Sequence, residues 1–228
     1  MTLEYVNILF ELIAFLFAIS VHESAHAWTA NRCGDPTARM LGRITLNPIK
    51  HIDLFGTVVV PLLAMLTHFP VIGWAKPTPV DPRNFKNPIL DDVLTAVAGP
   101  ISNFMVAAVA TLLLVAIGLT SATGRMIVEE VLHGIAVGNS PLVPASLLLR
   151  AFLEINVLLA VFNLIPVPPL DGSHVLRHFL SDDVRRVYDT VGVFGLMALV
   201  FFGGQFLMAL IRPVLSFYFS VILVLMRI

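Results

Sequence analysis

Three ionisable side chains lie together near the start of the chain, in the segment Val21-His22-Glu23-Ser24-Ala25-His26-Ala27. In a helix, the four-residue spacing of His22 and His26 places both imidazoles on one face, one turn apart. This geometry suits two nitrogen ligands of one Zn²⁺ ion. Glu23 follows the first histidine, where its carboxylate can take a proton from a metal-bound water. The segment therefore predicts a zinc site with its own general base.

A third ligand is needed, because catalytic zinc sites have three protein ligands and one open position. The sequence offers Asp171, in the run Asn163-Leu-Ile-Pro-Val-Pro-Pro-Leu-Asp-Gly172. The prolines predict the end of a helix, and Gly172 allows a tight turn. Asp171 would then lie on a rigid break, where its carboxylate can face a cavity. Taken alone, Asp171 is better explained as a solvated turn residue or as the N-cap of a helix over residues 173–180.

The composition is that of a membrane protein. Of the 228 residues, 57% are apolar and 13% are charged, and the mean hydropathy is +0.90. Soluble domains are about 45–50% apolar and about 25% charged. This excludes a soluble globule, a disordered tail and a basic nucleic-acid-binding module, and the net charge of −1 predicts no nucleic-acid partner. The single cysteine, Cys33, excludes an internal disulfide. We therefore expect one integral-membrane domain over residues 1–228, surrounded by the lipid bilayer.

Six apolar stretches predict the helices. They cover residues 6–30, 55–71, 93–119, 145–165, 190–211 and 214–226. A helix needs about 20 apolar residues to cross a bilayer, and the first, third, fourth and fifth stretches meet this length. The fold class is thus an all-α polytopic membrane protein with about five to six transmembrane helices. The second stretch is short and contains Pro61, so a re-entrant or broken segment is expected near residues 55–71.

The basic residues are unevenly distributed among the loops. Ten of the fourteen fall in three loops, around residues 31–54, 72–92 and after the fourth stretch. Cytoplasmic loops are enriched in Lys and Arg, so all three are expected in the cytoplasm. The first two loops flank the second stretch, and they share a side only if that stretch is re-entrant. The N-terminus would then be external, with Arg212 at an external turn between the last two stretches.

The same topology decides whether Asp171 can reach the histidines. If the second stretch were a full span, three crossings would separate His26 from Asp171 and leave them on opposite sides of the membrane. If it is re-entrant, only two crossings intervene and Asp171 returns to the histidines. The distribution of charge and the geometry of the site therefore favour the same topology.

These motifs strongly resemble the site-2 protease family of intramembrane zinc metallopeptidases. The resemblance rests on His22-Glu23-Ser24-Ala25-His26 and on the Asn163–Gly172 run, and Gly99-Pro100-Ile101-Ser102-Asn103 is similar to the family's third motif. Two further segments are similar to those of a compact prokaryotic branch of the family, Gly34-Asp35-Pro36-Thr37 and Gly73-Trp74-Ala75-Lys76-Pro77. The likeness extends from about residue 20 to about residue 180. We expect neither the PDZ domain nor the CBS domain that family members often carry.

The resemblance implies roles for individual residues. His22, His26 and Asp171 would bind one Zn²⁺ ion, and Glu23 would be the catalytic base. The active site would open toward the cytoplasm of a prokaryotic plasma membrane. Asn103 and Asn163 would hold the substrate backbone or the developing oxyanion, although interhelical hydrogen bonds explain polar residues in apolar helices as well.

We therefore expect a zinc metalloendopeptidase that hydrolyses peptide bonds in or near transmembrane segments of membrane protein substrates. The alternative is a zinc-binding membrane protein, such as a transporter or a scaffold, without protease activity. Residues 73–80 contain two prolines that favour extended backbone. We expect this segment near the mouth of the site, where it would pair with an unwound substrate as an added strand.

Overall fold

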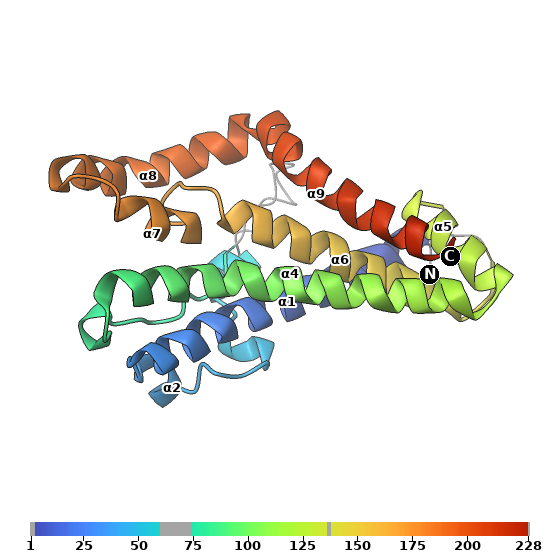
Figure 1. Cartoon of the computed structure of the whole chain (residues 1–228), viewed down its shortest axis with the longest axis horizontal. Helices are drawn as coiled ribbons and strands as arrows, with labels where there is room; N and C mark the ends of the chain where they lie inside the picture. The colour runs from blue at the N-terminus through green and yellow to red at the C-terminus, as the bar shows by residue number, and fades with distance from the viewer. Residues whose placement is uncertain (1–2, 60–73, 136–137, 228) are drawn as a thin grey trace. The chain divides into compact units, whose positions relative to one another are not determined.

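The fold is all-helical, as the sequence predicts (Figure 1). The structure, a computed structural model, describes residues 3–59, 74–135 and 138–227, and these residues include no β-strand. The elements are α1 (Leu3–Cys33), α2 (Thr37–Met40), η1 (Pro48–Lys50), η2 (Leu54–Val59), η3 (Pro82–Asn84), α4 (Pro88–Thr120), α5 (Ala122–Leu132), α6 (Leu142–Asn163), α7 (Asp171–Arg177), α8 (Asp182–Phe202) and α9 (Gly204–Leu225).

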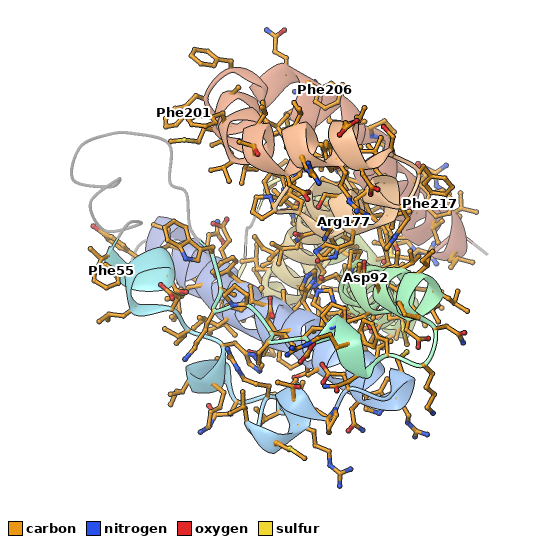
Figure 2. All side chains as sticks on the ribbon, turned by 90° about the vertical axis from the view of Figure 1, so that its left-hand side faces the viewer. Phe55, Asp92, Arg177, Phe201, Phe206 and Phe217 are labelled. Carbon is orange, nitrogen blue, oxygen red and sulfur yellow. The ribbon has the colours of Figure 1, made fainter. Side chains whose placement is uncertain are left out.

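Four helices in the described residues are long and apolar enough to cross a membrane. They are Tyr5–Cys33 within α1, and α4, α6 and α9 over their full lengths. The expected number of five to six spans is approximate, because the second apolar stretch lies mostly outside the described residues and α8 begins with charged residues. Exposed phenylalanines such as Phe55, Phe201 and Phe217 suit a protein surface in contact with lipid (Figure 2). The chain is an integral membrane protein.

The turn expected at Arg212 is wrong. Helix α9 runs through Arg212 and Pro213 without a break, and the chain instead interrupts its helix at Gly203, between α8 and α9. Glycine weakens a helix because it leaves the backbone most conformational freedom. A proline can remain inside an apolar helix when the surroundings satisfy the freed carbonyl. The glycine pair, rather than the proline, therefore sets this boundary.

The re-entrant segment expected near residues 55–71 falls largely on residues outside those described. Its described flanks lie side by side. The Trp74 N–H donates to the Gly56 carbonyl at 3.1 Å, and the Thr57 hydroxyl donates to the Trp74 carbonyl at 2.8 Å. A Cβ added at Gly56 would lie 2.4 Å from the Trp74 indole, so only glycine permits this approach. The two loops that the charge pattern assigns to one side therefore meet here.

The sequence analysis missed helix α5, in a region expected to be a loop. Its N-cap is Ser121, whose hydroxyl oxygen accepts from the Gly124 N–H at 2.9 Å. Ile127, Val131, Val143 and Leu147 form a buried apolar cluster with this helix. The spacing of its buried residues is that of an amphipathic helix, and this was the signal available in the sequence.

The chain forms two compact units, and the first comprises residues 1–18, 103–160 and 209–228. Within it, the fully buried Asn103 donates to the Asn156 side-chain oxygen at 2.7 Å and to the Ala18 carbonyl at 3.3 Å. Asn156 in turn donates to the Phe152 carbonyl at 2.7 Å. Arg150 and Glu154 form an i,i+4 ion pair at 2.8 Å. The amides of Asn103 and Asn156 and the Arg150–Glu154 pair thus find partners within the unit.

The second unit comprises residues 19–102 and 161–208 and holds all the candidate zinc ligands. Helix α1 ends at Cys33, and Gly34 follows with a φ of 115°. A left-handed glycine is a common way to end a helix. Here a Cβ at Gly34 would also lie 2.8 Å from the Asn84 carbonyl oxygen, so the glycine lets the segment around η3 approach the helix end.

Asp35 joins these two segments. Its fully buried carboxylate accepts hydrogen bonds from the N–H and hydroxyl of Thr37, from the Asp81 N–H at 2.8 Å and from the Asn84 amide at 2.9 Å. Burial opposes the charge, but these four donors outweigh burial and hold the pKa of Asp35 below its usual range. The ionised carboxylate therefore stabilises the connection between α1 and η3.

Replacing Asp35 by Asn should lower the stability of the protein in detergent by about 2–3 kcal/mol at neutral pH. The amide NH₂ of the new side chain would lie against N–H and hydroxyl groups that also donate, and those groups would lose their acceptor. The wild-type contribution is present above the ordinary carboxyl pKa of about 4 and is lost as the pH falls through the depressed folded pKa. Thermal unfolding between pH 7 and pH 2 should therefore show a weaker pH dependence for Asp35→Asn. The exposed Asp182→Asn change is the control and should behave like the wild type.

Candidate metal centre

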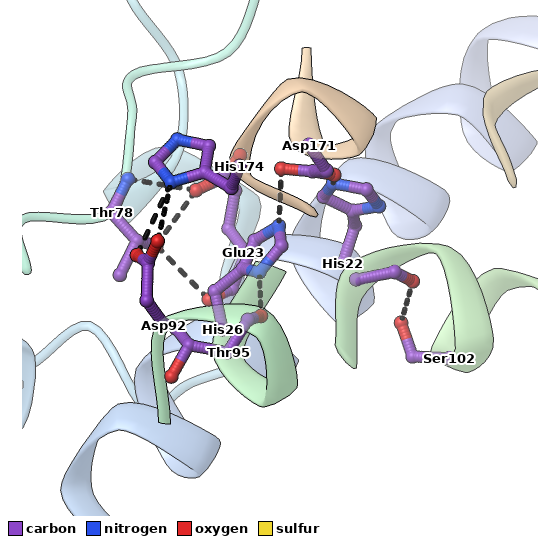
Figure 3. A network of polar contacts seen from close by, with 10 residues as sticks. His22, Glu23, His26, Thr78, Asp92, Thr95, Ser102, Asp171 and His174 are labelled. Atoms are coloured by element: carbon purple, nitrogen blue, oxygen red, sulfur yellow. Dashed lines mark hydrogen bonds and ion pairs between the residues drawn. The ribbon is translucent and has the colours of Figure 1, made fainter. Parts of the chain in front are cut away.

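Two histidines and one aspartate meet at one point in the second unit. His22 and His26 lie in the C-terminal half of α1, and Asp171 is the first residue of α7. The Nε2 atoms of His22 and His26 lie 3.1 and 3.4 Å from the two carboxylate oxygens of Asp171 (Figure 3). One potential metal-binding atom from each of the three residues lies within 4.8 Å of the other two. The described residues contain no other such group of His, Cys, Asp and Glu side chains.

The cluster is buried, and one of its oxygens lacks a hydrogen bond. The side chains of His22, His26 and Asp171 are 9%, 10% and 19% exposed. Asp171 Oδ2 is close enough to His22 for an ion pair but is not aligned as a hydrogen bond, and no other described group donates to it. A buried acceptor without a donor is costly, and a cation at this point would satisfy it.

A backbone carbonyl orients one of the two imidazoles. His26 Nδ1 lies 2.7 Å from the Thr95 carbonyl oxygen, which can only accept. The proton of a neutral imidazole is then on Nδ1, and the lone pair of Nε2 points toward the Asp171 carboxylate. A positive charge, carried by a proton or by a metal ion, is therefore needed between Nε2 and this carboxylate. Metal-binding histidines are commonly fixed in this way by a carbonyl on the other nitrogen.

Asp171 is prepared as an anionic ligand. Burial favours the neutral form of its carboxyl group, but the positive charge and the hydrogen bonds that protonated His26 and His22 would supply outweigh burial and hold the pKa of Asp171 below its usual range. The carboxylate is therefore ionised at neutral pH. Together with two imidazole nitrogens it forms a donor set that suits Zn²⁺ and leaves a coordination position open.

The loop that carries Asp171 is held by close backbone contacts. Helix α6 ends at Asn163, before the prolines, as the sequence predicts. A Cβ at Gly172 would lie 2.3 Å from the Leu164 carbonyl oxygen, and one at Gly192 of α8 would lie 2.4 Å from the Pro168 ring. The Tyr188 hydroxyl also donates to the Pro166 carbonyl at 3.0 Å. Helix α8 therefore packs against the loop and fixes the start of α7.

Gly99 of α4 lies directly against the two imidazoles. A Cβ at this position would be 2.4 Å from His26 Nε2 and 2.6 Å from His22 Nε2. Any larger residue would thus displace the atoms that face Asp171. The resemblance of the Gly99–Asn103 segment to a family motif did not reveal this function of the glycine, which depends on the approach of α4 to α1.

Glu23 is bound by Thr78 of the extended segment that follows Trp74. The Thr78 N–H and hydroxyl donate to Glu23 Oε2 at 2.8 and 2.7 Å, and the hydroxyl also lies 3.0 Å from the Glu23 carbonyl oxygen (Figure 3). Of residues 73–80, which are expected near the site, Thr78 therefore contacts a candidate site residue directly.

The pairing of this segment with a substrate strand stays a prediction, and the backbone limits it. The Lys76 N–H donates to His51, the Thr78 N–H donates to Glu23, and Pro77 and Pro79 have no N–H. The Arg43 guanidinium binds the carbonyl of Pro77 at 3.0 Å. A substrate could pair with few remaining groups, so a continuous ladder along residues 74–80 is not available.

A second pair of histidines secures α7. His174 Nδ1 and His178 Nε2 lie 3.2 and 2.8 Å from the carboxylate of Asp92 on α4. Their four-residue spacing places both on one side of the helix, and this was a signal that the sequence analysis did not use. Asp92 thus links α7 to α4 through two ion pairs. This contact involves the helix whose first residue is Asp171.

The two asparagines suggested for substrate or oxyanion binding differ in their surroundings. Asn103 belongs to the first unit, is fully buried and bonds to α1 and α6, which favours the interhelical alternative. Asn163 is the last residue of α6 and is half-buried in the second unit. Its role at the site stays a prediction.

Replacing Gly99 by Ala should abolish stoichiometric zinc binding, because the added methyl group would push the Nε2 atoms of His22 and His26 out of position. A Gly→Ala change within a helix otherwise stabilises by about 0.5–1 kcal/mol. Zinc per purified protein, measured by elemental analysis, should fall well below one. Gly195→Ala in α8 is the matched control, because its Cβ would make only an ordinary contact of 3.5 Å. Full zinc occupancy in Gly99→Ala would contradict the site.

Comparisons with known proteins agree with this donor set. The chain is 37% identical over 174 residues to a Bacillus subtilis protein named "Putative zinc metalloprotease YwhC", covering 76% of this chain and 70% of the relative. It is 28% identical over 221 residues to "Putative zinc metalloprotease Rip2" of Mycolicibacterium smegmatis, covering 95% of this chain and 73% of the relative.

A Mycobacterium tuberculosis protein that is also named "Putative zinc metalloprotease Rip2" is 28% identical over 200 residues, covering 87% of this chain and 68% of the relative. No solved structure matches the chain. Residues 10–203 match the family described as Peptidase family M50. This match contains both histidines, Glu23 and Asp171, and the chain therefore belongs to peptidase family M50, the site-2 protease family that its motifs resemble.

Proposed function

We propose that this protein is an intramembrane zinc metalloendopeptidase in which His22, His26 and Asp171 hold one Zn²⁺ ion and Glu23 is the general base. The observation that carries the proposal is the buried Asp171 carboxylate, which faces two imidazole nitrogens and keeps one oxygen without a hydrogen bond. Membership of peptidase family M50 supports the reaction class.

A zinc ion bound by these residues would supply the Lewis acidity that activates water and polarises a peptide carbonyl near neutral pH. Glu23 follows a ligand directly in α1, so its carboxylate can take the proton from the attacking water. The same carboxylate then passes a proton to the leaving amine. The Thr95 carbonyl keeps the His26 ring oriented. Asp171 keeps its negative charge directed toward the two imidazoles.

The substrates are membrane proteins cut in or near a transmembrane segment. The backbone of a membrane-spanning helix is fully hydrogen-bonded, so the helix must unwind before a carbonyl can enter the site. Helix-breaking residues near the cleaved bond are therefore expected. Asn163 at the end of α6 is the remaining candidate for contact with the substrate backbone.

The site opens toward the cytoplasm of a prokaryotic plasma membrane in this proposal. Two candidate spans, α4 and α6, separate His26 from Asp171, and an even number returns the chain to the same side. The hydrogen bonds between the flanks of the second apolar stretch support the same arrangement. The basic loops then lie on the cytoplasmic side.

The competing function is zinc binding by a transporter or scaffold without protease activity. Zinc binding requires the ligands but does not require Glu23. The two functions therefore differ in what they predict for Glu23, while both need the histidines.

Glu23→Gln should retain zinc but reduce cleavage of a transmembrane reporter by about 10²- to 10⁴-fold, the usual contribution of a general base. His22→Ala should lose both zinc and cleavage. Both are measured on purified protein in liposomes, with reporter cleavage followed by gel and zinc by elemental analysis. His133→Ala, an exposed histidine of the first unit, is the control and should keep both properties. If Glu23→Gln cleaves at the wild-type rate, the mechanism proposed for Glu23 is wrong.

A further inference from the structure

We infer that Thr78 is a positioning residue that holds the carboxylate of Glu23 in its working orientation. The inference rests on the proposed function, in which Glu23 is the general base. Two donors of Thr78, its N–H and its hydroxyl, reach the same oxygen of Glu23, Oε2, at 2.8 and 2.7 Å. The described residues offer no hydrogen bond to the other oxygen, Oε1, which is left to act on the proton of the attacking water.

The hydroxyl of Thr78 also bridges two parts of Glu23. It lies 2.7 Å from the carboxylate and 3.0 Å from the carbonyl oxygen of the same residue. A glutamate side chain has several rotatable bonds, and freezing them costs conformational entropy. Hydrogen bonds from Thr78 to the carboxylate and to the main-chain carbonyl of Glu23 restrict this side chain before substrate arrives.

Thr78 can hold Glu23 because its own segment is held elsewhere. On one side, the Lys76 N–H donates to the His51 carbonyl at 2.8 Å and Arg43 binds the Pro77 carbonyl at 3.0 Å. On the other side, the Asp81 N–H donates to Asp35 at 2.8 Å. These anchors do not involve Glu23, so the position of Thr78 is set by the loops.

The flanking prolines make the contact specific to Thr78. Pro77 and Pro79 have fixed φ angles and no N–H, so the Thr78 N–H is the one backbone donor between them. The fixed backbone directs this donor, together with the threonine hydroxyl, toward α1. Residues 77–79 therefore form a rigid segment that holds the carboxylate of Glu23.

The arrangement does not depend on burial of an apolar group. Thr78 is half-buried, and valine has nearly the same shape as threonine without the hydroxyl. Thr78→Val thus removes one of the two donors and keeps the N–H, while Thr78→Ser keeps both donors. The pair of variants separates the hydrogen bond from the packing.

Thr78→Val should lower kcat for the transmembrane reporter about tenfold, with KM within about twofold of the wild type and one zinc still bound, because a misplaced catalytic group slows the chemical step. Thr78→Ser should restore kcat to within about twofold. Thr190→Val is the matched control, because its hydroxyl bonds to the Arg186 carbonyl within α8. An unchanged kcat in Thr78→Val, or a loss of zinc along with kcat, would overturn the inference.

A double variant adds a second readout. Glu23→Asp shortens the side chain so that it no longer reaches Thr78, and Thr78→Val should then have little further effect on kcat. Additive losses would show that Thr78 acts elsewhere and overturn the inference. If Glu23→Gln alone kept full activity, the proposed function would fail first, so the two failures are distinguishable.

Discussion

A buried carboxylate that faces two imidazole nitrogens requires a positive charge between them. Asp171 is held ionised, and the Thr95 carbonyl turns the Nε2 atom of His26 toward it. Without a positive charge among them, the three groups would repel one another in surroundings that screen charge poorly. Zinc satisfies this requirement and suits the donor set. The close contacts around the cluster are best understood as the means of keeping these three residues together.

Small residues and prolines supply the necessary approach distances. Gly99 lets α4 lie against both imidazoles, and Gly172 lets the start of α7 lie against the end of α6. Gly192 brings α8 onto Pro168, so a helix without a ligand still supports the loop that carries Asp171. Each contact would be blocked by a single added carbon. The site is therefore intolerant of substitution at positions that carry no functional group themselves.

Glu23, the proposed general base, is hydrogen-bonded to the extended segment that follows Trp74. Thr78 connects Glu23 to the extended segment, and Asp35 and Arg43 connect that segment to the end of α1 and the following loop. The same hydrogen bonds therefore fix both the extended segment and the side chain of Glu23. A substitution in this segment would therefore change the orientation of Glu23 more directly than the positions of His22, His26 and Asp171.

Much of this could be read from the sequence because it depends on local pattern. The four-residue spacing of His22 and His26, the apolar helices and the proline-rich break before Asp171 are all properties of neighbouring residues. Asp171 lies beside the two histidines, as expected from the sequence. The turn expected at Arg212 is absent, because the glycine pair at residues 203–204 ends the helix instead, and helix α5 was not expected.

Only the tertiary structure decided which partners complete the site. Thr95 lies 69 residues from His26 and Thr78 lies 55 residues from Glu23, and no local pattern marks either one. The reason is that these contacts use a backbone carbonyl and a backbone N–H, which every position in the chain could offer apart from the proline donors. The sequence by itself identified the side chains that we propose for the chemistry. The packing of α4, α7 and the extended segment against α1 decided how those side chains are oriented.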